Sequence, residues 1–114
     1  MGVLASQMRL MTLISTKNYI EYKSMGITEQ MSNLSAQIAN KDEFAVNLNS
    51  ESPEAKALEA EKERLQVQEK KLEQQQTALQ TQLQEVMNEI QACRQMLQGD
   101  INGSGLFSYG MQGR

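Results

Sequence analysis

Apolar residues recur every seven positions along the second half of the chain. One series is Leu58, Leu65, Leu72, Leu79, Val86 and Cys93, and a second, three or four residues away, is Leu83, Ile90 and Leu97. This spacing is typical of the a and d positions of a coiled coil, in which one stripe of a helix packs against another helix. The pattern predicts a long helix with a packing seam over residues 52–98.

Both ends of this helix carry terminal signals. Ser52 suits the N-cap and Pro53 suits the first helical position, whereas Gly99 stands where a left-handed cap usually ends a helix. Nearer its start, the positions that complete the seam are Lys62, Glu69 and Gln76. Polar residues at these positions lower stability and help to fix the register, so we expect a less stable seam there.

The first part of the chain, residues 1–40, has the same period. Its apolar stripe consists of Leu13, Ile20, Ile27 and Leu34, joined by Met31 and Ile38. Gly26 weakens a helix by about 1 kcal/mol relative to Ala. Two interpretations therefore stay open: one continuous amphipathic helix, or a helix with a break near residues 24–28.

Residues 41–51 are rich in Asn, Asp and Ser and are expected to form the connecting loop. Phe44, Val46 and Leu48 alternate with other residues within it, which favours an extended connector. The predicted fold is all-α: a long antiparallel helical hairpin, or coiled coil. In it the apolar end of the second helix meets the Met-rich start of the first.

Residues 99–114 contain too many glycines for a stable helix and are predicted to form a flexible tail. The tail nevertheless carries Leu106, Phe107 and Tyr109, which a pure linker does not need. It is either a frayed terminus or an anchor that becomes ordered against a neighbouring subunit.

Charge and residue types exclude several classes of function. The formal net charge of −3 gives no clustered excess of Lys and Arg, so we do not expect nucleic acid as a partner. The chain has no histidine and a single cysteine, Cys93, so the usual zinc sites and an internal disulfide are excluded. We expect no cofactor and no metal, and Cys93 is interpreted as a small apolar seam residue.

No constellation for catalysis stands out. The serines have no histidine partner, and Asn102-Gly103-Ser104-Gly105 lacks the Lys and the following helix of a phosphate-binding loop. The chain is therefore not expected to be an enzyme. The eight methionines are interpreted mainly as core filling, with surfaces that repack against different partners as the alternative.

The apolar opening segment lacks a basic stretch before it and contains Arg9, which argues against a secretory signal peptide. No apolar run is long enough to span a bilayer. We expect a cytoplasmic protein, or one exported by a signal-independent route. Contact with a membrane through residues 1–23 is an alternative, because this segment contains three cations, Arg9, Lys17 and Lys23, and only one acid.

Two resemblances bear on function. Residues 1–11, Met-Gly-Val-Leu-Ala-Ser-Gln-Met-Arg-Leu-Met, resemble the start of small, mostly uncharacterised bacterial helical proteins that begin Met-Gly-Leu-Ala-Ala-Ser-Gln-Ala-Arg-Leu-Leu. Residues 72–83 and 85–102 look similar to the Gln/Glu/Leu-rich ending of those proteins. Residues 33–40 are similar in composition to the filament-forming axial proteins of flagella and type III secretion systems. The second resemblance implies terminal helices that pack into an assembly.

These observations favour a non-enzymatic structural protein that assembles with itself as a homo-oligomer, such as a component of a bacterial filament or secretion-type assembly. The alternatives are an adaptor or chaperone-like module for another helical protein, and a peripheral membrane protein.

Overall fold

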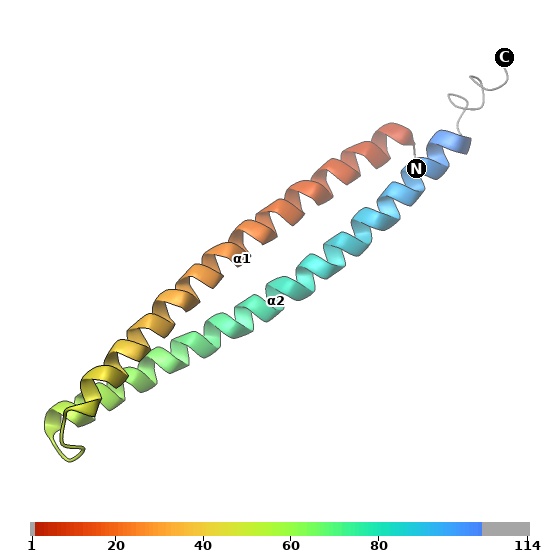
Figure 1. Cartoon of the computed structure of the whole chain (residues 1–114). Helices are drawn as coiled ribbons and strands as arrows, with labels where there is room; N and C mark the ends of the chain where they lie inside the picture. Colours follow the sequence, from red (N-terminus) through yellow and green to blue (C-terminus); the bar gives the residue numbers. More distant parts are fainter. Residues whose placement is uncertain (1, 104–114) are drawn as a thin grey trace. The chain divides into compact units, whose positions relative to one another are not determined.

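The computed structural model describes residues 2–103, which form two helices (Figure 1). Helix α1 spans Val3–Val46 and helix α2 spans Pro53–Gly103, with residues 47–52 between them. The fold is all-α, with two long helices packed antiparallel. This confirms the fold class that the two seven-residue patterns predict.

The described residues divide into two units. Unit 1 contains residue 2 and residues 3–22 of α1, beside residues 81–103 of α2. Unit 2 contains residues 23–80, including the connection between the helices. Each unit thus has its own stretch of seam.

The predicted seam lies on the covered sides of both helices. Its most buried residues are Leu13, Ile20, Ile27, Leu65, Leu79, Ile90 and Cys93. Its half-buried residues are Met31, Leu34, Ile38, Leu58, Leu72, Leu83, Val86 and Leu97. None of the fifteen is exposed, so the sequence pattern identified the packing stripes correctly in both helices.

Helix α1 extends beyond the predicted boundary at residue 40 and ends at Val46. The extended connector expected around Phe44 and Val46 is therefore wrong. Two ion pairs hold this part of α1 against α2: Lys41 with Glu61 at 3.4 Å, and Asp42 with Lys62 at 2.7 Å. These contacts favour helix where local propensity alone favours a loop.

Neither Gly26 nor Gly99 interrupts its helix. Helix α1 is continuous through Gly26, so the break considered at residues 24–28 does not occur. Helix α2 continues past Gly99 to Gly103, and no glycine within residues 2–103 has a positive φ. The extension is supported by Asp100, which accepts a hydrogen bond from Ser6 at 2.9 Å.

The start of α2 agrees with the sequence signals. The Ala55 amide donates a 3.1 Å hydrogen bond to the Ser52 hydroxyl oxygen, which makes Ser52 the N-cap, and Pro53 is the first helical residue. In the preceding turn, the Glu51 amide donates to the Asn49 side-chain oxygen at 3.0 Å.

Within the part of the chain that the structure describes, neither helix contains a stretch long and apolar enough to cross a membrane. The predicted tail anchor of Leu106, Phe107 and Tyr109 lies outside the described residues.

Candidate interaction surfaces

The core of unit 1 joins the start of α1 to the end of α2. Leu13, Ile90 and Cys93 are its buried residues, and the partly buried Leu10, Ile14 and Val86 pack against them. The apolar far end of the second helix therefore meets the start of the first, as the antiparallel prediction requires. Burying apolar surface in this way contributes about 25 cal/mol per Å².

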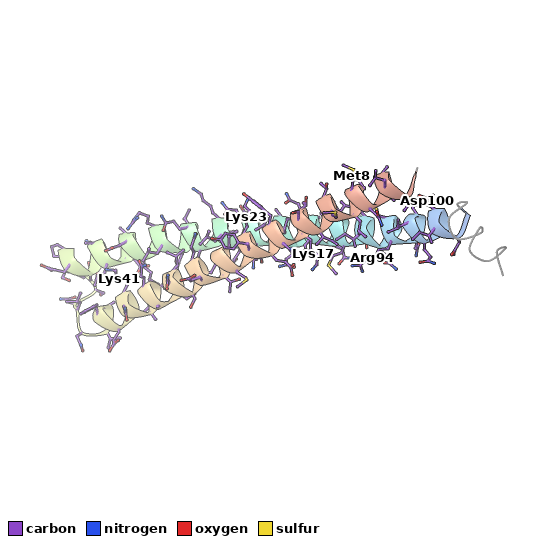
Figure 2. The ribbon with its side chains drawn as sticks, turned by 90° about the horizontal axis from the view of Figure 1, so that it is seen from above. Met8, Lys17, Lys23, Lys41, Arg94 and Asp100 are labelled. Atoms are coloured by element: carbon purple, nitrogen blue, oxygen red, sulfur yellow. The ribbon has the colours of Figure 1, made fainter. Side chains whose placement is uncertain are left out.

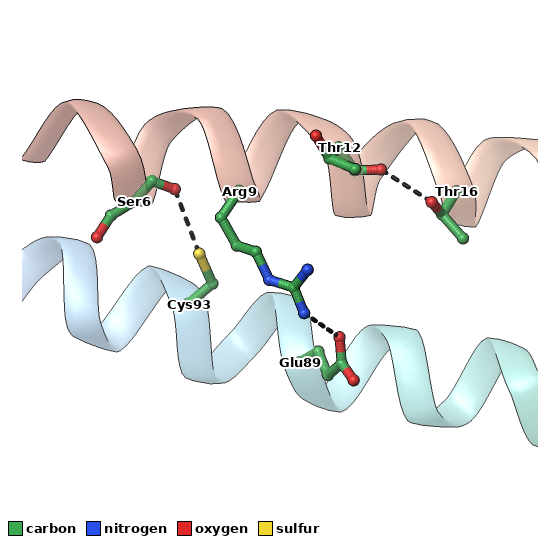
Figure 3. A network of polar contacts seen from close by, with 6 residues as sticks. All are labelled: Ser6, Arg9, Thr12, Thr16, Glu89 and Cys93. Carbon is green, nitrogen blue, oxygen red and sulfur yellow. Dashed lines mark hydrogen bonds and ion pairs between the residues drawn. The ribbon is translucent and has the colours of Figure 1, made fainter. Parts of the chain in front are cut away.

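A polar pair follows this core at the end of the seam. The Ser6 side chain is fully buried, and its hydroxyl donates a hydrogen bond to the Asp100 carboxylate at 2.9 Å. The Cys93 thiol donates to the Ser6 carbonyl oxygen at 3.3 Å (Figure 3). We did not predict this pair, although Ser6 lies seven residues before Leu13 and Asp100 seven after Cys93. Extending both patterns by one repeat would have found it.

An ion pair borders the same core. Arg9 on α1 reaches across to Glu89 on α2, with 3.0 Å between guanidinium nitrogen and carboxylate oxygen (Figure 3). About half of each side chain is exposed, so water screens the pair and it is worth at most about 1 kcal/mol.

The seam of unit 2 alternates apolar and polar contacts. Its buried residues are Ile27, Leu65 and Leu79. Close to Ile27 and Leu79, the Gln76 amide donates to the Thr28 hydroxyl at 3.0 Å, and the Gln80 amide donates to the Ser24 hydroxyl at 3.3 Å. The Gln76 side-chain oxygen is buried without a hydrogen-bond partner within residues 2–103. This supports the expectation of a weaker seam, because an unpaired buried polar atom lowers stability.

Close to the connection between the helices, two seam positions of α2 are occupied by charged residues. The hydrogen bond and the charge of Asp42 raise the pKa of Lys62 above its ordinary value of 10.5. The Ser35 hydroxyl donates to the Glu69 carboxylate at 2.8 Å. Lys62 and Glu69, which interrupt the apolar pattern, thus each find a partner on α1.

Several large apolar side chains lie outside the seam. On α1 in unit 1 they include Leu4, Met8, Met11 and Tyr22, and in unit 2 they include Phe44 and Val46. The interpretation of the methionines as core filling is wrong for most described members, because Met8, Met11, Met25, Met87 and Met96 are exposed. Only Met31 takes a half-buried seam position among the methionines of residues 2–103.

A groove of about 490 Å³ runs along one side of unit 1. Its lining residues are Ile14 and Lys17 on α1 and Met87, Ile90, Gln91 and Arg94 on α2. Figure 2 shows Lys17 and Arg94 along the same edge of the unit. We call this surface the cationic groove, because it combines apolar side chains with two cations.

A second groove, of about 320 Å³, lies in unit 2 and has a different character. Four of its six lining residues are Asn or Gln, and none is charged. The cationic groove is therefore the one of the two that can select a partner by charge.

Within residues 2–103 no group of three or more Cys, Asp or Glu side chains is placed to hold a metal ion. The exposed apolar side chains and the two grooves are the candidate interaction surfaces within residues 2–103. Comparisons with models of protein families, with curated proteins and with solved structures found no match to this chain.

Proposed function

We propose that the chain is a non-enzymatic structural protein that works by packing its helices against further copies of itself. One observation carries this proposal. The pairing of α1 with α2 leaves large apolar side chains exposed in both units, including Leu4, Met8 and Met11 in unit 1 and Phe44 and Val46 in unit 2.

The start of α1 is apolar on more than its covered side. Leu10 and Leu13 face α2, whereas Leu4, Met8 and Met11 face water. A helix that is apolar around its circumference is normally buried on all sides, and a large exposed apolar patch usually marks an interaction site. Flexible methionine side chains suit such a surface because they adapt to the partner's shape.

The oligomeric state tests this proposal. Sedimentation velocity over a dilution series is expected to show a species larger than one chain whose fraction rises with concentration, and negative-stain microscopy is expected to show particles or filaments. Replacing both Met8 and Met11 by Gln should weaken the assembly. The matched control is Val67→Gln, an exposed apolar side chain elsewhere on the helices. A wild-type chain that stays monomeric at the highest concentration would contradict self-assembly.

A second candidate function is that of an adaptor or chaperone-like module for another helical protein, and the cationic groove favours it. Isolation of the chain from its native source separates the two functions. A foreign protein in fixed stoichiometry supports the adaptor, and recovery of the chain with itself alone supports self-assembly.

A third candidate is a peripheral membrane protein. Arg9, Lys17 and Lys23 accompany the exposed Leu4 and Met8 near the start of the chain, a combination that suits an anionic lipid surface. Flotation with anionic vesicles tests it. Binding by the wild type that is lost on Leu4→Gln with Met8→Gln supports this function, and a chain that stays with the unbound protein contradicts it.

A further inference from the structure

The cationic groove combines apolar and positively charged lining residues. Ile90 is buried, Ile14 is half-buried and Met87 is exposed, so the lining presents apolar surface to a partner. Met11 lies one turn before Ile14 on α1 and extends this surface along the helix. The groove volume of about 490 Å³ leaves room for a large side chain.

Within residues 2–103, one of the two cations of the groove is engaged in an ion pair and the other is not. Lys17 is paired with Glu21 on its own helix at 3.1 Å. Arg94, which also lines the groove, makes no ion pair or side-chain hydrogen bond within residues 2–103. Because Arg binds carboxylates through two parallel hydrogen bonds, an acidic surface is its natural complement.

The chain carries such a surface in unit 2. Residues 42–54, which we call the acidic connection, contain Asp42, Glu43, Glu51 and Glu54 and no Lys or Arg. They also present Phe44 and Val46, whose side chains are 68% and 80% exposed. Asp42 is engaged with Lys62, but Glu43 and Glu51 are exposed and have no ion pair within the described residues.

We propose that the acidic connection of one copy docks into the cationic groove of a second copy. Phe44 packs on Ile14, Met87 and Ile90, and the carboxylates beside it pair with Arg94. Thirty positions of one continuous helix separate Ile14 from Phe44, so we assign the occupant of the groove to another copy. This inference rests on the proposed self-assembly and names its junction.

The junction joins two different surfaces. Each copy then has one groove and one acidic connection, and a contact of this heterologous kind leaves a free groove at one end and a free connection at the other. Further copies add until a ring closes, and without closure they form an open chain.

Two single substitutions separate the two sides of the junction. Arg94→Glu reverses the charge of the groove, and Phe44→Ser removes the aromatic ring of the connection. Both side chains are exposed and outside the seam, so circular dichroism should show unchanged helix content. Each variant alone is expected to associate about tenfold or more weakly than the wild type by sedimentation equilibrium. The matched controls, Lys71→Glu and Val67→Ser, alter exposed residues elsewhere on α2 and should associate like the wild type.

Mixing the two variants gives the sharper test. Arg94→Glu keeps an intact connection and Phe44→Ser keeps an intact groove, so an equimolar mixture is expected to form a dimer with one intact junction and to grow no further. In a separate experiment, adding Glu43→Arg and Glu51→Arg to the chain that carries Arg94→Glu should restore its association. A mixture that stays monomeric, or variants that assemble like the wild type, would overturn the junction.

The failures of the two proposals are distinguishable. A wild-type chain that is monomeric at every concentration overturns both self-assembly and this junction. A wild-type oligomer that neither Arg94→Glu nor Phe44→Ser weakens leaves self-assembly standing and overturns the junction alone.

Discussion

The hydroxyl of Ser6 donates a 2.9 Å hydrogen bond to the carboxylate of Asp100, a residue ninety-four positions later in the chain. Ser6 is fully buried, whereas Asp100 keeps some contact with water. The pair therefore holds the last described turn of α2 against the first turns of α1. It also explains why α2 continues beyond Gly99.

Removing the hydroxyl should destabilise the protein. Ser6→Ala is expected to lower the free energy of unfolding by about 1 to 2 kcal/mol, because it deletes a hydrogen bond to a charged group. The double variant Ser6→Ala with Asp100→Leu should recover most of that loss, since both polar partners are replaced by apolar ones. Urea denaturation at low protein concentration measures both values. Ser15→Ala, at an exposed position, is the control, and a loss no larger than that of the control would contradict the role of the pair.

A second prediction concerns the unpartnered oxygen of Gln76 in the seam of unit 2. Gln76→Leu should raise the free energy of unfolding by about 1 to 2 kcal/mol, because it removes a buried unsatisfied atom and adds apolar contact. Thr28 loses one hydrogen bond but still donates to the Ser24 carbonyl oxygen at 3.0 Å. Gln75→Leu, on the exposed neighbour, should leave stability nearly unchanged. A stability gain as large in this control would assign the effect to helix propensity.

The contact between Lys62 and Asp42 gives a prediction about pH. The pKa of Lys62 is raised above 10.5 by Asp42, so the charged amine is favoured in the folded state. Its contribution to stability is therefore fully present below the unfolded pKa of about 10.5 and is lost as pH rises through the folded value. Asp42→Asn should bring the Lys62 pKa back toward 10.5, as measured by NMR titration of its side-chain carbon resonances. An identical titration curve in wild type and variant would contradict the contact.

The N-cap of α2 gives the fourth prediction. Ser52 accepts a hydrogen bond from the Ala55 amide at 3.1 Å, and its own hydroxyl donates to the Asn49 carbonyl oxygen at 2.7 Å. Ser52→Ala should lower the free energy of unfolding by about 1 kcal/mol. Ser50→Ala, in the same connection, should change it by less than about 0.5 kcal/mol. Thermal unfolding followed by circular dichroism compares the two variants. An equal decrease in the free energy of unfolding would show that Ser52 does not act as a stabilising N-cap.

The packing stripes were predictable because one physical constraint sets them. A helix that packs on another must bury residues spaced three and four apart, and Leu13, Leu65 and Ile90 obey this rule whatever their partner is. The cap at Ser52 was predictable for a similar reason, since the hydrogen bond is made within one turn.

Helix ends and exposed surfaces were harder to predict. The helix ends depend on contacts with the other helix, and the exposed surfaces are the sides that the other helix leaves uncovered. Nothing local shows that Asp42 will meet Lys62, or that Asp100 will meet Ser6, and these contacts extend both helices past their expected boundaries. The exposure of Met8 and Met11 was missed because the composition of α1 does not say which of its apolar sides α2 covers. The cationic groove combines residues of both helices, such as Lys17 and Arg94, so the sequence pattern of one segment does not predict it.

The polar contacts along the seam limit how this chain can change in length. A seven-residue insertion into α2 alone would keep every leucine in phase, yet it would slide Gln76 and Gln80 away from Thr28 and Ser24, or Asp100 away from Ser6. These hydroxyls, amides and carboxylate would then lose their hydrogen-bond partners on the other helix. Longer or shorter forms are thus compatible with the same pairing only when both helices gain or lose a matching heptad at facing positions.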